Sequence, residues 1–386
     1  MSSSSELPLS GLVVVDLCQF LSGPYASLRL QDLGARVIKI ERPDGGDLSR
    51  RLYLTDTEIG GDSTNFHAIN RSKESLALDL KNPADLAALR KLLASADVVL
   101  QNFRPGVIER LGLDYAAVKA INPRIVYASI TGWGLEGPWV DRPGQDLLAQ
   151  ARSGVMWLNG DADQGPVPFG LAVADMLAGA AACQGILACL VRRGITGQGA
   201  HVETSLLEAL VDFQFEVLTA YLNDGQRLPS RSGFRSAHAY LAAPYGVYPT
   251  ADGWLAIAMT PIGRLAELFG LAALDPYKDK PKSWFSDRDA IKRIIADHVA
   301  SRPSQHWLDI LEPADIWCAR VLSWNELVES TGFKALDMLQ TVTREDNVSI
   351  RTTRAPIRIN GVRPTTSRAA PLIGEQSAAI RKEFGL

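Results

Sequence analysis

The sequence predicts an α/β fold in which an open, mostly parallel sheet forms a large domain and a smaller α+β domain follows. Two observations support this expectation. Short β-rich runs alternate with helical patterns through the first 130 residues, and the composition changes at residues 223–236, a polar, Gly- and Arg-rich stretch. The alternation is typical of a parallel sheet with helices on both faces. We expect domains at residues 1–224 and 225–330, with 331–386 returning to the first.

Five apolar runs predict the first strands of the sheet, and a further run predicts a sixth. The first five span residues 12–17, 36–41, 75–80, 97–103 and 124–130, and the sixth spans residues 200–205. Helical patterns cover residues 83–96, 146–156 and 206–222. In open parallel sheets, ligands bind beyond the carboxyl ends of the strands. The loops after these runs are therefore where we expect a binding site.

The second domain is predicted to begin with a hairpin that turns at residues 251–253, because Ala-Asp-Gly separates two β-rich runs. Helical segments follow to about residue 330. The run RAPIRI at 354–359 is expected to rejoin the large domain as a strand, followed by a helix.

Composition excludes several functional classes. The chain has 386 residues and a formal net charge of −3, without a basic stripe, which argues against a nucleic-acid partner. No secretory signal pattern is evident at the N-terminus. Four cysteines occur in apolar contexts without metal spacing, and five histidines form no HxxxH pair. These features predict a cytoplasmic enzyme without a metal site or a membrane partner.

Common nucleotide and hydrolase motifs fail on inspection. GWGLEG at residues 132–137 matches the dinucleotide pattern, but Pro138 and Pro143 follow it where a helix would have to open toward a pyrophosphate. The chain has no Walker A motif and no G-x-S-x-G elbow. The sequence therefore lacks the motifs that usually indicate nicotinamide binding, ATP hydrolysis or serine-esterase activity.

One carboxylate precedes an unusually apolar run. Residues 176–191 are apolar or small apart from Gln184, and Asp175 lies at the head of this run. The pattern predicts a helix buried on every side, too short for a membrane span of roughly 20 residues. Taken alone, Asp175 would be interpreted as a helix N-cap.

Eight ordered segments together resemble the family III CoA-transferases of the CaiB/BaiF type. The resemblance runs from about residue 9 to 260 and resumes weakly near the end. The segments are LSGPYAS (21–27), KIERPDGGDLSR (39–50), NRSKESLALDLK (70–81), QNFRPGVIERLGLDY (101–115), SITGWGLEGPW (129–139), PGQDLLAQARSG (143–154), ADMLAG (174–179) and GQGAHVETSLLEAL (197–210).

The resemblance implies transfer of coenzyme A from an acyl-CoA to a free carboxylic acid. Asp175 matches the family's nucleophile, which forms a mixed anhydride with the acyl group and then an aspartyl-CoA thioester. The implied substrates are acyl-CoA and a small acid, without a permanently bound cofactor. We expect the helix N-terminus to keep Asp175 ionised and apolar walls to exclude water.

The same resemblance assigns the coenzyme A contacts. Arg42 would lie beside the adenine, with Lys73 and Arg110 near the phosphates, although each could also be a solvated loop charge. The NFRPG turn adds Asn102, Phe103 and Arg104, for which backbone shaping is as plausible as contact.

Close relatives in this superfamily epimerise 2-methylacyl-CoA thioesters, which requires two acid/base groups. The family's His-Asp step is replaced here by Gln145 and Asp146, and glutamine has no usable proton-transfer pKa. Transferase chemistry is therefore favoured. Gln145 could donate a hydrogen bond to a carboxylate, and Asp146 could orient the loop. A racemase and a non-catalytic CoA-binding protein stay open as alternatives.

Acid specificity and assembly are predicted less directly. Relatives with a glycine run in the second domain close a lid over the intermediate, whereas this chain has SGFRSAHAYLAAPYG, which places such a lid in doubt. Polar side chains there could bind the second carboxylate of a dicarboxylic acid: Arg231, Arg235, His238 and Tyr240. The resemblance implies a Rossmann-like sheet in the large domain. It also implies an interlocked homodimer, with chain crossings near residues 223–236 and 325–355.

Overall fold

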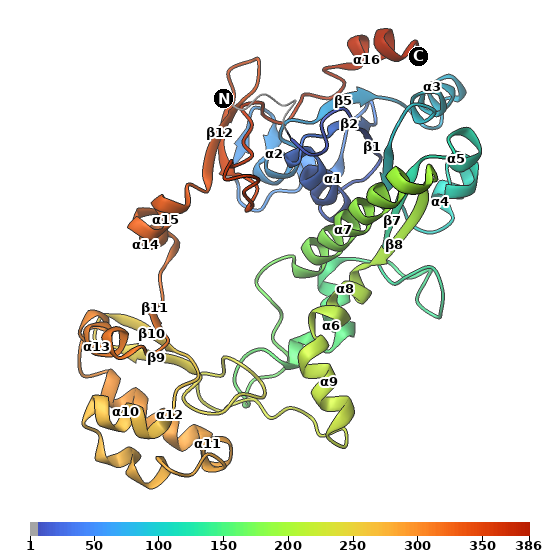
Figure 1. The fold of residues 1–386 in the computed structure, drawn as a ribbon. Coiled ribbons are helices and arrows are strands. Elements are labelled where there is room, and N and C mark those ends of the chain that lie inside the picture. The colour runs from blue at the N-terminus through green and yellow to red at the C-terminus, as the bar shows by residue number, and fades with distance from the viewer. Residues whose placement is uncertain (1–6) are drawn as a thin grey trace. The chain divides into compact units, whose positions relative to one another are not determined.

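The computed structural model describes residues 7–386 and contains two compact units (Figure 1). The first consists of the residues up to Arg152, Ala172–Phe213 and Leu336–Leu386, and the second of Ser153–Leu171 and Gln214–Ala335. These units differ from the domains expected at 1–224, 225–330 and 331–386, because residues 153–171 and 214–224 group with the second unit. The C-terminal segment groups with the first unit.

A six-stranded parallel sheet forms the centre of the first unit. Its spatial order is β5-β2-β1-β6-β7-β8, and every neighbouring pair is parallel. The strands are β1 (Val13–Asp16), β2 (Arg36–Glu41), β5 (Glu74–Ala77), β6 (Val98–Gln101), β7 (Val126–Thr131) and β8 (Ala200–Ser205). All six runs expected to be strands are strands, and the Rossmann-like parallel sheet is confirmed. The strand order reverses between β1 and β6, where such sheets bind ligands.

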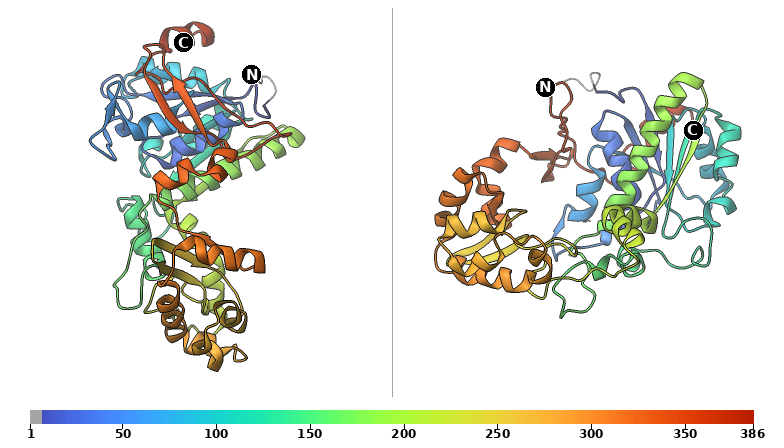
Figure 2. Two further views of the ribbon diagram at one scale, coloured as in Figure 1. Left: turned by 90° about the vertical axis from the view of Figure 1, so that its left-hand side faces the viewer. Right: turned by 60° about the horizontal axis from the view of Figure 1, so that its bottom comes forward.

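Alternating strand residues face two separate cores. Val14 and Val98 pack with helices α1 (Ser22–Asp32) and α7 (Val173–Thr196). Val15 and Val99 pack on the opposite face with α3 (Pro83–Leu93), α5 (Tyr115–Ile121) and α16 (Ser377–Phe384). Figure 2 shows α7 lying along its face of the sheet. The remaining helices of this unit are α2 (Thr64–Asn70), α4 (Val107–Arg110), α6 (Asp146–Ser153) and α8 (Leu206–Phe213), with the short strands β3 (Glu58–Ile59) and β4 (Asp62–Ser63) and the 3-10 turn η2 (Leu48–Arg51).

Helix α7 differs from the expected helix in length and in burial. It has 24 residues, so the argument that it is too short for a membrane span is wrong; by length and composition alone it could cross a bilayer. A core helix of an α/β domain meets the same criteria, and α7 packs along α1 and the sheet. The expectation of burial on every side is also wrong, because one stripe is exposed in this chain, including Met176, Val191 and Ile195.

The C-terminal segment joins the first unit through specific contacts. Strands β12 (Leu339–Thr343) and β13 (Ser349–Thr353) form a hairpin, and α16 follows. Gln376 accepts a hydrogen bond from the Ser75 backbone N–H at 2.8 Å, which fastens this segment to the edge strand β5. The return to the large unit is confirmed, but the strand expected at 354–359 is wrong, since pairing occurs at 349–353 instead.

The second unit contains a three-stranded antiparallel sheet in the order β11-β10-β9. The hairpin expected around residues 251–253 is confirmed as β9 (Gly246–Thr250) and β10 (Gly253–Ile257), and β11 spans Cys318–Arg320. The helix expected at 206–222 is interrupted at Gln214, so α8 lies in the first unit and α9 in the second. The helices here are α9 (Phe215–Asn223), α10 (Ile262–Phe269), α11 (Ser283–Ser286), α12 (Arg288–Val299), α13 (Ser304–Leu311), α14 (Trp324–Glu329) and α15 (Thr331–Leu336), with the 3-10 turns η3 (Val155–Trp157), η4 (Ala272–Tyr277) and η5 (Glu312–Ala314).

Candidate active site

Asp175 lies in the first turn of α7, two residues after the helix begins at Val173. Burial and the neighbouring charge of Asp146 raise the pKa of Asp175 to about 7, against a side-chain hydrogen bond with Ser22 that lowers it. Burial and the Asp146 charge therefore oppose the ionisation that the helix N-terminus was expected to favour. A carboxyl group that titrates near neutral pH inside a partly buried site is a candidate for catalysis.

Asp146, rather than Asp175, accepts the free N–H groups at the start of α7. Its Oδ1 accepts hydrogen bonds from the backbone N–H of Ala174 at 2.7 Å and of Asp175 at 3.3 Å. Its Oδ2 accepts from Gln150 at 2.7 Å within α6. Asp146 is buried and connects the starts of two helices, and it satisfies N–H groups that the N-cap residue of α7, Ala172, leaves without a side-chain acceptor. It therefore fixes the backbone of Asp175 and opposes its ionisation.

Gln145 is exposed at the start of α6, where its Oε1 accepts a hydrogen bond from the backbone N–H of Leu147 at 3.0 Å. The side-chain amide nitrogen is the group that could meet a substrate carboxylate. The proposed catalytic contribution of Gln145 stays a prediction.

A glycine allows Asp175 to approach the start of α1. Gly179 lies one helical turn after Asp175, on the same face of α7. A Cβ atom at Gly179 would lie 2.4 Å from the carbonyl oxygen of Ser22, which leaves no room for a side chain. The close packing of α1 on α7 therefore brings Ser22, the first residue of α1, to the nucleophile candidate.

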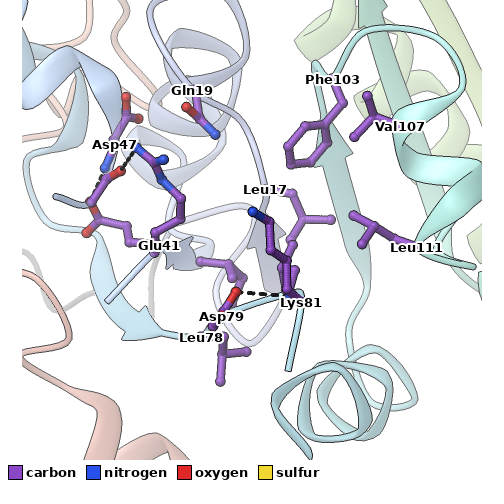
Figure 3. A pocket seen from close by; sticks show the side chains of 14 residues that line it. Leu17, Gln19, Glu41, Asp47, Leu78, Asp79, Lys81, Phe103, Val107 and Leu111 are labelled. Atoms are coloured by element: carbon purple, nitrogen blue, oxygen red, sulfur yellow. Dashed lines mark hydrogen bonds between the residues drawn. The ribbon is translucent and has the colours of Figure 1, made fainter. Parts of the chain in front are cut away.

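A cavity of about 200 Å³ opens at the carboxyl ends of β1, β2, β5 and β6. Figure 3 shows Phe103, Val107 and Leu111 along one wall, with Gln19 and Asp47 across from them. The cavity spans the point where the strand order reverses, as the fold predicts. Its full lining is Leu17, Gln19, Ile40, Glu41, Arg42, Gly46, Asp47, Leu78, Asp79, Leu80, Lys81, Phe103, Val107 and Leu111.

Two exposed cations border this cavity, and sequence reasoning found one of them. Arg42 follows β2 and lines the cavity, and its expected place beside the adenine stays a prediction. Lys81 also lines it and was missed. The signal was available, because Lys81 follows the carboxyl end of the run at 75–80, whereas Lys73 precedes that run.

Lys73 does not reach this cavity, and its expected phosphate contact is wrong for this structure. Its side chain is fully buried, and Nζ donates to Asp16 at 3.0 Å, to the Pro24 carbonyl at 2.9 Å and to Asn70 at 2.8 Å. Burial lowers the pKa of Lys73 to about 8, against the charge of Asp16. Three protein acceptors use all three N–H bonds of the ammonium group, so none is left for a phosphate.

The remaining CoA candidates occupy different positions. Asn102 ties two loops together, since its amide accepts from the backbone N–H of Gln19 at 2.9 Å and donates to its carbonyl at 2.7 Å. Phe103 lines the main cavity, and Arg104 lines a second cavity of about 60 Å³. Arg110 is exposed at the end of α4 and lines neither of these two cavities.

The two arginines of the second unit that were expected to bind an acid differ in their exposure to solvent. Arg231 is buried and donates to the carbonyl oxygens of Asn159, Gln164 and Gly165, so its guanidinium is largely used internally. Arg235 is exposed, with its guanidinium 4.5 Å from the ring of Trp254. The expected role of Arg231 in binding a carboxylate is therefore wrong here, and Arg235 is the accessible cation of the pair.

His238 and Tyr240 lie in the same loop, half-buried. The Nδ1 atom of His238 accepts a hydrogen bond from the Tyr240 backbone N–H at 3.2 Å, and the contribution of both side chains to acid binding stays a prediction. Within the described range 7–386, no group of three or more His, Cys, Asp or Glu side chains is arranged to hold a metal ion.

Comparison with known proteins identifies one family. The model of "CoA-transferase family III" matches residues 9–377. An acetyl-CoA:oxalate CoA-transferase from Acetobacter aceti is 34% identical over 98% of this chain and 96% of its own length. A succinate–glutarate CoA-transferase from Agrobacterium fabrum is also 34% identical, over the same shares of both chains.

Solved structures agree with these sequence matches. A CAIB/BAIF family protein from Brucella suis superposes with a TM-score of 0.85 at 32% identity, covering 98% of this chain and 99% of that chain. Rv3272 from Mycobacterium tuberculosis superposes with a TM-score of 0.82 at 28% identity, covering 96% of this chain and 98% of that chain.

Proposed function

This chain belongs to CoA-transferase family III, and on that premise we propose that it moves coenzyme A from an acyl-CoA to a dicarboxylic acid through covalent intermediates on Asp175. The observation that carries the mechanism is the place of Asp175. It is a partly buried carboxyl group whose pKa is raised to about 7, and it lies against the first residue of α1. The loop before α1 lines the cavity at the carboxyl edge of the sheet.

In the first half of the reaction, ionised Asp175 attacks the thioester carbonyl of the donor. The C–S bond breaks, and CoA leaves as a thiolate, giving an anhydride between Asp175 and the acyl group. The thiolate then attacks the aspartyl carbonyl, and the donor's acyl group departs as a free carboxylate. The enzyme is left as an aspartyl-CoA thioester.

The second half repeats these steps in reverse order with the incoming acid. Its carboxylate attacks the aspartyl thioester, CoA thiolate leaves, and the new anhydride is opened by the thiolate at the substrate carbonyl. Asp175 is released as a carboxylate. Each step exchanges acyl groups of similar reactivity, and the partly buried site limits loss of the intermediates to water.

Coenzyme A is proposed to bind in the cavity that contains Arg42 and Lys81. Both cations are exposed and stand at the carboxyl ends of neighbouring strands, and apolar side chains such as Phe103 and Leu111 also line the cavity. This combination suits a ligand with an aromatic base and several phosphates. Arg104, which lines the second cavity, and the exposed Arg110 are further candidates for phosphate contacts.

Dicarboxylic acids are proposed as the acid class. The names of the relatives support this proposal, since they act on oxalate, succinate or glutarate. Within the second unit, the exposed Arg235 is the cation proposed to bind a carboxylate.

We also propose that the enzyme is an interlocked homodimer. The exposed apolar stripe of α7, with Val191 69% and Ile195 83% exposed, supports a partner surface, because such side chains are costly to leave in water as a group. The segments expected to cross between chains are those near residues 223–236 and 325–355.

The direct test of the chemistry is Asp175→Ala, assayed with succinyl-CoA and a panel of dicarboxylic acids. Transfer should fall by several orders of magnitude while CoA still binds, because the nucleophile is lost and the cavity is intact. Asp141→Ala, which removes an exposed carboxylate of the same unit, is the matched control and should transfer normally. Substantial turnover by folded Asp175→Ala would refute the mechanism.

A further inference from the structure

The loop between β1 and α1 connects the cavity to the nucleophile candidate. Gln19 lines the cavity, and Ser22, three residues later, contacts Asp175. Because consecutive Cα atoms are about 3.8 Å apart, Phe20 lies within about 8 Å of the Cα atom of Ser22. Phe20 therefore lies in the chain between a residue that lines the cavity and a residue that contacts Asp175.

The backbone of Phe20 adopts a conformation that is unfavourable for a bulky residue. Its φ angle is +64°, in the left-handed region that glycine or asparagine normally occupies. Such strain persists only where the surrounding structure enforces it, and it concentrates at functional sites. The side chain carried by this strained residue is 46% exposed.

Buried side chains hold the loop in this conformation. The backbone N–H of Phe20 donates to Asp47 at 3.2 Å, and Asp47 is fixed by a 2.6 Å ion pair with Lys39 inside the unit. The preceding residues are held in the same way: Asp16 accepts from the N–H of Cys18 at 2.9 Å, and Asn102 bonds both backbone groups of Gln19. The loop is preorganised, and its one large exposed apolar group is the ring of Phe20.

We propose that Phe20 protects the reaction from hydrolysis. Its ring covers the acyl and thioester intermediates on Asp175 and keeps water from them. This proposal rests on the proposed function, since it requires a covalent intermediate. In the unwanted reaction, water attacks the aspartyl carbonyl, the C–S bond breaks, CoA leaves as the thiol and Asp175 is regenerated as the acid. An apolar ring over the carbonyl excludes the attacking water without taking part in the transfer.

The test compares transfer with hydrolysis in the full-length enzyme, using succinyl-CoA with and without glutarate. Free CoA measures hydrolysis, and glutaryl-CoA measures transfer. Phe20→Ala should raise the ratio of hydrolysis to transfer by about tenfold or more, whereas Phe20→Leu, which keeps an apolar side chain, should restore most of the protection. Phe285→Ala removes an exposed phenylalanine in the second unit and should leave the ratio unchanged.

A glycine variant separates the ring from the backbone. Phe20→Gly removes the backbone strain as well as the ring, so its melting temperature should equal or exceed that of Phe20→Ala. Its ratio of hydrolysis to transfer should be as high as that of Phe20→Ala. Unchanged ratios in both variants would overturn the proposal while leaving Asp175 chemistry intact. Failure of the proposed function itself would appear separately, as normal transfer by Asp175→Ala.

Discussion

At the scale of single residues, the protonation state of Asp175 determines whether the proposed reaction can begin. The nucleophile must be ionised, and burial together with the charge of Asp146 raises its pKa to about 7. We therefore expect kcat/KM to fall about tenfold per pH unit below the neutral range. Asp146 has a second task, because it accepts the N–H groups at the start of α7. These two tasks can be separated by substitution.

We expect Asp146→Asn to move the acid limb of the pH profile of kcat/KM to lower pH. The asparagine oxygen can still accept from the N–H of Ala174, while the negative charge that disfavours ionised Asp175 is removed. Asp146→Ala, which also removes the acceptor, should in addition lose about 1 kcal/mol of stability. An acid limb that stays in place in Asp146→Asn would contradict the proposed coupling of the two carboxyl groups.

The same pKa predicts that the nucleophile destabilises the fold. Its folded value of about 7 exceeds its ordinary value of 3.8, so the native state binds the proton more tightly than the unfolded state. The stabilising effect of that proton is complete below pH 4 and is lost as the pH rises through 7. Asp175→Asn should therefore be more stable than the parent by roughly 2–4 kcal/mol at pH 8, and nearly equal to it at pH 4.

Urea denaturation at both pH values measures this difference. An Asp175→Asn variant no more stable than the parent at pH 8 would show that the carboxylate is well solvated in the folded protein.

At the scale of elements, the parallel sheet was predictable and the roles of its charged residues were only partly so. Most of the β-rich runs that predicted the strands are buried, because a strand covered on both faces is apolar nearly throughout, whereas the edge strand β8 is more polar and mostly half-buried. Lys39 lies within β2 and Lys73 directly precedes β5, and both are buried, each paired with an aspartate from another segment. Long-range pairing of this kind cannot be inferred from one sequence. The rule that ligands lie beyond the carboxyl ends of strands did favour Lys81 over Lys73.

Two helices show what periodicity cannot reveal. The pattern at 206–222 is apolar across the point where Gln214 interrupts it and the chain enters the second unit. The run after Asp175 is apolar on all sides, yet one stripe is exposed in this chain. Apolar composition indicates that a surface will be covered, but it does not say whether the same chain covers it. Likewise, Asp175 taken alone would be interpreted as an N-cap, whereas Asp146 at the start of α6 accepts the first N–H groups of α7.

The contrast between buried and exposed lysines gives a prediction at this scale. Lys73→Ala should lower the free energy of unfolding by about 3–5 kcal/mol, because Asp16 would remain buried without its cation. Arg42→Ala and Lys81→Ala should fold normally and raise the KM for acyl-CoA more than they lower kcat. If Lys73→Ala were as stable as the parent and only its KM for acyl-CoA changed, Lys73 would contact the phosphates of coenzyme A, as expected from the sequence.

At the scale of the whole molecule, the account predicts a permanent dimer. The exposed apolar stripe of α7 and the long connecting segments near residues 223–236 and 325–355 favour an extensive interface between two chains. Permanent interfaces of this kind bury upwards of about 2,000 Å². Light scattering at nanomolar and micromolar concentrations should give twice the chain mass of 41.9 kDa. The mass of a single chain at either concentration would refute the dimer.

A change on α7 would locate that interface. Ile195→Glu places a charge on a side chain that is 83% exposed in the single chain, so the substitution is harmless to a monomer and disruptive to a dimer that covers this stripe. Glu216→Lys, at an exposed charged position on α9, serves as a charge-changing control. A dimer unaffected by Ile195→Glu would place the interface elsewhere.

The central claim is that Asp175 carries the acyl group and then coenzyme A. The most direct measurement is mass spectrometry of the enzyme incubated with succinyl-CoA alone, then treated with hydroxylamine and digested. The account predicts that hydroxylamine opens the aspartyl thioester, so that the peptide containing Asp175 gains the mass of a hydroxamate and transfer activity is lost in parallel. An unmodified Asp175 peptide from enzyme that transfers CoA at its normal rate, or the same modification on a different carboxylate, would contradict it.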